Sequence, residues 1–185
     1  MTQPSGLRRG RETSLTQWWS THENRRRRAD EHRVRMFVRS FAPAPGQHER
    51  QQRLISGLES AVGASLIDSY EISMLGERLC YCCQCRESSG ADRLRETVDQ
   101  LRGWEDGGLA ASGFEERDID SAITDEQYRV IVPPELTLGV YFDDTLAGVF
   151  PCEGEVHVYQ PDTYLTMGLD QYAEASQDSG KGVTF

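Results

Sequence analysis

Four of the five cysteines in this chain stand within six residues, in the run Cys80-Tyr81-Cys82-Cys83-Gln84-Cys85. The run contains two overlapping C-x-x-C spacings, and thiolates are soft ligands that suit zinc or an iron–sulfur cluster. Structural zinc sites usually combine two separated pairs of ligands, so two of these cysteines joined by Cys152, His157 or a second chain would make the better geometry. Zinc is thus the candidate cofactor. The candidate metal ligands are Cys80, Cys82, Cys83, Cys85 and Cys152.

Other chemistries fit the same cysteine run. The thiols would form a redox-sensing loop if their pKa values are lowered and they are accessible. They would be inert if they are small buried hydrophobes at a strand end or an accident of a variable loop. A cluster of this kind does not resemble the disulfide framework of a secreted protein.

Arginine supplies the second candidate chemistry, because guanidinium groups contact the phosphates of nucleic acids. A run of four arginines lies near the N-terminus, and three more lie on a predicted helix among several acidic residues. The alternative is a solvated basic tail and an ordinary exposed helix face. The candidate nucleic-acid contacts are Arg25, Arg26, Arg27, Arg28, Arg93, Arg95 and Arg102, and the candidate partner is DNA or another protein.

Signatures of enzyme chemistry are missing from the sequence. There is no Walker loop, no G-x-G-x-x-G, no G-x-S-x-G and no H-E-x-x-H. The four histidines show no mutual metal spacing, and His32 and His48 are expected to face solvent. The sequence therefore favours a protein without catalysis, and a small-molecule-binding or enzymatic domain with a hidden site is a further alternative.

The charge balance indicates the solvent in which the chain works. Its net charge is -10, and Lys181 is the single lysine among 20 basic residues. An acidic surface that uses arginine favours molar salt, where charge repulsion is screened within roughly 3 Å. The alternative is an acidic protein encoded by a GC-rich genome. With no apolar run of membrane length and no apolar signal region, a cytoplasmic protein that does not enter a membrane is expected.

The elements that must position these residues follow from the apolar periodicity. Alternating Val34, Met36 and Val38 predict a strand from Arg33, which ends at a Pro-Gly turn. Residues 47–62 and 91–104 predict amphipathic helices, with a strand between them over 66–79. Parallel pairing of the first two strands is expected. The later predicted strands cover 114–119, 128–132, 136–142, 146–150 and 156–159, with a turn at Asp143-Asp144.

This order predicts an α+β fold: β-α-β-α followed by a β-meander, with two helices packed on one face of one mixed sheet in a ferredoxin-like or related sandwich. The predicted domain covers residues 33–168. Residues 1–32 are predicted to form a disordered basic arm, in which Trp18-Trp19 would dock on the body or on a partner. Residues 169–185 are predicted to form a flexible tail.

Several segments resemble a family of small haloarchaeal proteins labelled HTH domain proteins. The resemblance runs over residues 33–165 and is carried by 33–43, 75–80, 127–134 and 149–152. It implies a winged helix-turn-helix and transcription regulation, and it implies that Cys80 and Cys152 form the pair most worth testing. A helix-turn-helix needs two helices joined by a short turn, whereas a strand and the cysteine run separate the two predicted helices.

The sequence as a whole predicts a regulatory or interaction protein of a halophilic archaeon, associated with DNA and without catalysis. The first alternative is a cysteine-based metal or redox module. The second is a domain that binds or converts a small molecule at a site that the sequence does not reveal.

Overall fold

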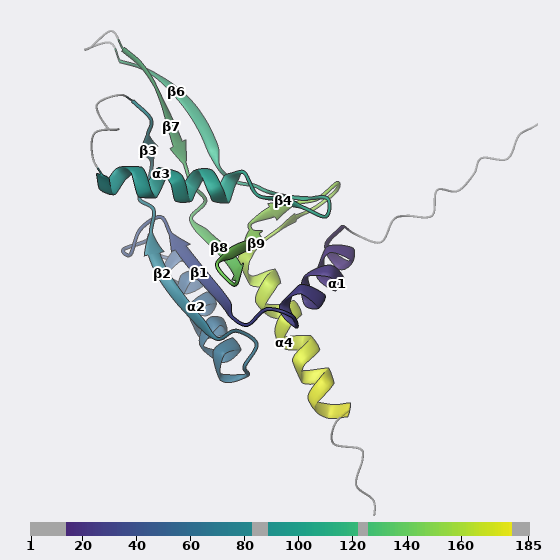
Figure 1. Cartoon of the computed structure of the whole chain (residues 1–185). Helices are drawn as coiled ribbons and strands as arrows, with labels where there is room; N and C mark the ends of the chain where they lie inside the picture. The colour runs from purple at the N-terminus through teal and green to yellow at the C-terminus, as the bar shows by residue number, and fades with distance from the viewer. Residues whose placement is uncertain (1–13, 83–88, 122–125, 179–185) are drawn as a thin grey trace, which may run out of the picture.

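The computed structural model describes residues 14–82, 89–121 and 126–178, which form helices around three small sheets (Figure 1). The α+β class predicted from the sequence is confirmed. Within these residues no helix has both the length and the apolar composition to cross a bilayer.

The largest sheet has the strand order β2-β1-β8-β9. Its strands are β1 (His32–Val38), β2 (Ser69–Met74), β8 (Leu136–Phe142) and β9 (Thr145–Phe150). Strand β1 pairs with β2 in parallel and with β8 in antiparallel register, and helix α2 (Gln47–Gly63) connects β1 to β2. Asp143 and Asp144 both have positive φ at the turn between β8 and β9, as a tight hairpin requires. The predicted parallel β-α-β unit and the predicted hairpin are thus confirmed.

Two smaller sheets extend this body. One has the order β3-β7-β6, with β3 (Leu79–Cys80), β7 (Glu126–Val132) and β6 (Glu115–Ser121). The β6–β7 hairpin projects away from the large sheet in Figure 1. The other has the order β11-β10-β5-β4, with β4 (Glu105–Asp106), β5 (Leu109–Ala111), β10 (Cys152–Glu153) and β11 (Val158–Tyr159).

The helices lie on both faces of the large sheet, which differs from the predicted one-face packing. On one face, Leu136 of β8 lines a hollow with α2 and α4 (Pro161–Asp178). On the other face, Gly139 of β8 lies against α3 (Ser89–Arg102). The Leu101 methyl of α3 lies 3.2 Å from where a Cβ on Gly139 would stand. Because side chains alternate along a strand, these two contacts belong to opposite faces of β8.

The N-terminal segment corrects the predicted boundaries. Residues Ser14–Arg26 form helix α1, so the prediction of a disordered arm over 1–32 is wrong for this part; residues 1–13 lie outside the described residues. Trp18 and Trp19 are buried in the core, which confirms that they dock on the body. Leu15, Trp18, Trp19 and His22 follow the i, i+3, i+4, i+7 spacing of one helix face.

The C-terminal segment also differs from its prediction. Helix α4 runs through residue 178, across the boundary at 169 where a flexible tail was expected. Pro161 is its first residue, a position where the missing proline N–H costs no helical bond. Tyr164 and Leu165 are buried against α1 and α2, so tertiary packing stabilises the helix.

Candidate functional site

The cysteines that the sequence singled out are divided between two sheets. Cys80 lies in β3 and pairs with Val130, whereas Cys152 lies in β10 between β5 and β11. No disulfide links Cys80, Cys82 and Cys152. The N–H of Cys82 donates a hydrogen bond to the Cys80 sulfur (3.3 Å). In the described part of the chain no group of three or more metal-ligating side chains could hold an ion; Cys83 and Cys85 lie outside it.

Cys152 has the environment of a core residue. It is fully buried, and burial raises the pKa of its thiol to about 12. A thiol with such a pKa is almost entirely protonated at neutral pH, and metal ligation and nucleophilic attack both need the thiolate. Cys152 therefore behaves here as a small buried hydrophobe, which is one of the alternatives the sequence left open.

The predicted nucleic-acid arginines divide into two groups. Arg25 pairs with Asp106, Arg26 with Glu23, and Arg102 with Asp99 and Glu116. Arg95 is buried; it donates to the carboxylate of Asp92 (2.8 Å) and to the carbonyl of Cys80 (2.9 Å), so it fixes the start of α3. Of the seven predicted arginines, Arg27, Arg28 and Arg93 are exposed and form no ion pair with a described residue.

Other arginines gather in a continuous depression that the sequence did not predict. Three adjoining hollows of about 200, 250 and 250 Å³ share lining residues: the first two share Arg50 and Leu136, and the last two share Arg39 and Glu77. We call this depression the arginine groove. Its charged lining consists of Arg39, Arg50, Arg53, Arg78 and Arg117 with Glu77, Glu135 and Asp162.

The charge of the arginine groove is opposite to that of the molecule. Five guanidinium groups face three carboxylates there, on a chain whose net charge is -10. Arg117 is paired with Glu115, but the other four arginines form no ion pair with a described residue. The groove therefore presents four arginines that form no ion pair, together with three carboxylates, whereas Arg25, Arg26 and Arg102 are each paired.

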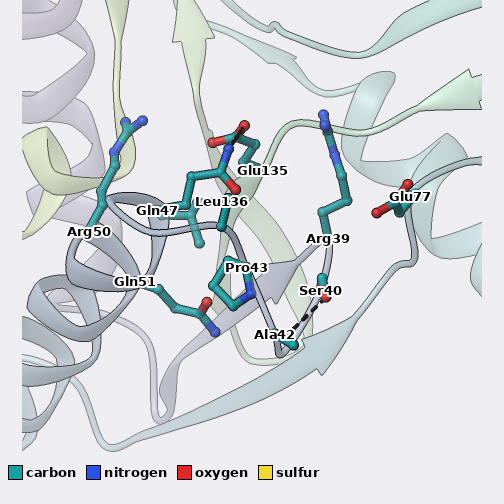
Figure 2. Close-up of a pocket in the computed structure, with 11 residues that line it drawn as sticks. Arg39, Ser40, Ala42, Pro43, Gln47, Arg50, Gln51, Glu77, Glu135 and Leu136 are labelled. Atoms are coloured by element: carbon teal, nitrogen blue, oxygen red, sulfur yellow. Dashed lines mark hydrogen bonds between the residues drawn. The ribbon is translucent and has the colours of Figure 1, made fainter.

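The middle hollow lies at the carboxyl edge of the parallel strands and is shown in Figure 2. Arg39 and Ser40 directly follow β1, Gln47 to Gln51 form the first turns of α2, Glu77 follows β2, and Glu135 directly precedes β8. We call this hollow the edge cavity. Ligands of open α/β sheets bind outside the carboxyl ends of the strands, where the connections diverge.

Hydrogen bonds hold some walls of the edge cavity in place. Arg39 donates through Nε to the carbonyl of Pro133 (3.1 Å), and Arg50 donates to Gln160 (2.7 Å). Gln47 donates to the carboxylate of Glu135. Gln51 is 6% exposed, and its amide, which forms no hydrogen bond with a described residue, keeps contact with solvent. Figure 2 shows its side chain extending from α2 beneath the loop that carries Pro43.

A second polar cluster lies at the opposite end of β1, and it is buried; Nδ1 of His22 and Nε1 of Trp19 have no hydrogen-bond partner there within the part of the chain that the structure describes. The tyrosyl oxygen of Tyr164 lies 3.1 Å from Nε2 of His22 and 3.0 Å from Nε2 of His32. Nδ1 of His32 lies 2.7 Å from the carbonyl of Leu66, which can only accept, so this nitrogen carries the proton. The Tyr164 hydroxyl therefore donates to His32 and accepts from His22. Sequence reasoning placed His32 at the surface, and that prediction is wrong, because it is 5% exposed.

Burial determines the protonation of this cluster. Desolvation lowers the pKa of His22 to about 2 and that of His32 to about 4, and it raises the pKa of Tyr164. Trp18 stacks on His22 with ring centroids 4.4 Å apart. Both imidazoles are thus neutral at physiological pH, and the cluster joins α1, β1 and α4 as a structural element.

The residues of the arginine groove carried one signal that sequence analysis did not use. Arg39-Ser40 follows the apolar residues of the first predicted strand, and Arg50-Gln51 lies in the first turns of the helix predicted over 47–62, so both stand near the strand-to-helix connection of a β-α-β unit. Glu77 and Glu135 come from distant segments, and their position at the same edge follows only from the pairing of β2 and β8 with β1.

The fold and the groove together define an α+β domain with arginines and carboxylates gathered along one edge. A family model described as helix-turn-helix domain matches residues 26–173, and the chain belongs to this family. The searches of curated proteins and of solved structures gave no match. Among the described residues, at least one strand separates each helix from the next. This part of the chain therefore contains no pair of helices joined by a short turn.

Proposed function

We propose that this chain is a regulatory protein that associates with DNA and contacts the phosphate backbone through the arginine groove. The observation that carries the proposal is the set of arginines without ion pairs, Arg39, Arg50, Arg53 and Arg78, on an acidic chain of the helix-turn-helix domain family. Phosphate contacts of this kind release counterions and supply most of the affinity for nonspecific DNA.

Helix α2 adds a surface that supports the same proposal. Its exposed residues next to the groove include His48, Gln52 and Arg53. Glutamine and arginine form bidentate hydrogen bonds with adenine and guanine edges in the major groove. In this proposal the groove arginines, Arg53 among them, position the protein on the backbone, and Gln52 reaches the bases.

The salt dependence of DNA affinity tests this proposal. Affinity for a mixed-sequence duplex would be measured by fluorescence anisotropy over a series of KCl concentrations. Replacing Arg50 and Arg53 together with alanine is expected to lower the slope of log affinity against log salt by about two, one for each lost phosphate contact.

The matched control removes the same charge elsewhere, with Arg27→Ala and Arg28→Ala in one variant. Both residues are exposed and lie outside the groove, at the end of α1. Their variant is expected to keep the slope of the unmodified chain. A loss confined to this control would assign DNA contact to the basic segment predicted from the sequence and overturn the proposed groove. The absence of DNA binding by the unmodified chain at every salt concentration would overturn the function itself.

We further propose that the chain works in a salt-rich cytoplasm, which the acidity and the single lysine support. Carboxylates crowded on a surface repel one another at low ionic strength. The free energy of unfolding, measured with urea, is expected to rise from dilute buffer to molar KCl. A fall over that range would contradict salt adaptation.

A further inference from the structure

Phe41 is a large apolar side chain that the fold leaves in solvent. It is 59% exposed, whereas Phe37, four residues earlier in β1, is 1% exposed and belongs to the core. Phe142 and Phe150 are buried as well. Because the transfer of a phenylalanine ring out of water is what stabilises a core, a ring that stays in solvent contributes little to folding. The Phe41 ring is therefore available to a partner.

The loop that carries Phe41 connects β1 to α2 and is fastened on both sides of the ring. Before it, the N–H of Arg39 donates to the carbonyl of Glu135 (3.1 Å). After it, the N–H of Ala42 donates to the hydroxyl of Ser40 (3.1 Å). Two prolines follow in the same loop and fix their own backbone φ angles. Since the loop is ordered in advance, a partner that contacts the ring loses little free energy to ordering it.

The charge around Phe41 indicates which partner this is. Residues 39–48 contain no aspartate or glutamate, in a chain that has 30 of them. Arg39 precedes the ring by two residues, Arg50 lies in the first turns of the helix that follows, and both line the arginine groove. The carboxylates of the groove come from other segments of the chain. Along the chain, the ring thus stands between two residues that contact phosphates in the proposed function.

An apolar side chain beside phosphate contacts can act on DNA as a wedge. Proteins that bend DNA insert phenylalanine, leucine or methionine between neighbouring base pairs, and the cost of unstacking is offset by the larger protein surface that the bent duplex covers. This cost depends on the sequence that is deformed. Pyrimidine–purine steps are flexible and easily unstacked, whereas A-tracts are stiff.

We propose that Phe41 is a wedge that inserts between base pairs, and that the DNA this chain binds best contains pyrimidine–purine steps. The inference rests on the proposed association with DNA and adds to it the class of DNA site that is preferred. The groove arginines supply affinity for any sequence, because they contact the backbone. The ring supplies a preference for DNA that is easily deformed.

Two duplexes of equal length and base composition test this preference. One has a central run of alternating T and A, and the other has an A-tract at the same place. In fluorescence anisotropy the full chain is expected to bind the alternating duplex about fivefold or more tightly than the A-tract duplex. Phe41→Ala is expected to bind the two duplexes equally and to keep the salt dependence of the unmodified chain, because the arginines are unchanged.

A fluorescent adenine analogue in the alternating run reports the insertion itself. Its emission is quenched by stacking, so the emission is expected to rise when the full chain binds and to stay low with Phe41→Ala. Phe41→Leu keeps an apolar wedge and is expected to retain most of the rise. The control Val156→Ala shortens an apolar side chain that is 81% exposed and lies outside the groove, and it is expected to retain all of the rise.

Three results would overturn the wedge: equal binding of the two duplexes by the unmodified chain, binding without a rise in emission, or a preference and a rise that persist in Phe41→Ala. Each of them leaves the phosphate contacts untouched. If the unmodified chain binds neither duplex at any salt concentration, the association with DNA itself is wrong. The failure of the inference and the failure of the proposed function are therefore distinguishable.

Discussion

The polar residues at the two ends of strand β1 differ in burial and in their hydrogen-bond partners. At its start, His32 is buried and its ring nitrogens bond to Tyr164 and Leu66, so its polar atoms are satisfied by the protein itself. Beyond its end, Arg39 lines a cavity in which charged side chains of both signs form no ion pair with a described residue and keep contact with solvent. The buried cluster therefore contributes to stability, with only Nδ1 of His22 and Nε1 of Trp19 lacking a partner among its polar atoms, whereas the charged groups at the other end remain accessible from outside.

The largest effect is expected at the buried end, where Trp18 fastens α1 to the core. Trp18 packs between His22, Trp104 and Phe150 and is 1% exposed. Replacing it with alanine is expected to lower the free energy of unfolding by about 3–5 kcal/mol, measured with urea. The exposed neighbour Gln17→Ala serves as the control. Equal stability of the two variants would mean that α1 contributes nothing to the fold.

The next prediction compares one hydroxyl with one amide. Tyr164→Phe removes the partner of both histidines and is expected to destabilise the protein by about 1–3 kcal/mol. Gln51→Leu removes an amide that keeps contact with solvent and is expected to change stability by less than about 0.5 kcal/mol. Urea unfolding of both variants measures the two effects. If both substitutions destabilise the protein equally, the contrast between the two ends of β1 is wrong.

A smaller effect concerns pH. Because the pKa values of His22 and His32 are lowered in the folded state, the unfolded chain binds protons more readily below about pH 6.5. Their contribution to stability is complete above pH 6.5 and is lost as the pH falls toward 4 and then 2. Between pH 6.5 and 5 the loss is expected to be about 1.5 kcal/mol per histidine.

His22→Phe provides the comparison for this pH effect. It keeps an aromatic ring against Trp18 and removes one titrating group, so the stability curve of this variant should fall less steeply between pH 6.5 and 5. Chemical unfolding at a series of pH values supplies both curves. Parallel curves for the variant and the unmodified chain would show that His22 is not buried in neutral form.

Much of the fold could be predicted because its strands and α2 repeat apolar residues at their own periods. Leu54 and Leu58 of α2 are buried as the helical spacing predicts, and β8 has the predicted bounds. Helix α1 escaped prediction because His22 completes its buried face, and a histidine beside an arginine run resembles a polar tail. Helix α4 was not predicted because it contains small and polar residues and is stabilised by contacts with α1 and α2.

The candidate site was less predictable than the fold. Its arginines are ordinary in sequence, and what distinguishes Arg39 and Arg50 from Arg25 and Arg26 is the lack of a carboxylate within reach. That difference depends on segments far apart in the chain, which only the folded molecule brings together. The cysteines were more conspicuous in sequence, but Cys152 is a buried thiol with a raised pKa, and the described residues contain no group of metal ligands.

Hydrogen–deuterium exchange of the full chain, with and without duplex DNA, tests most directly whether the open edge is the functional one. On DNA binding, exchange is expected to slow in residues 39–53, which contain Arg39, Arg50 and Arg53, and to stay unchanged in residues 14–32. Slower exchange confined to the segment around Arg27 and Arg28, with residues 39–53 unaffected, would contradict it.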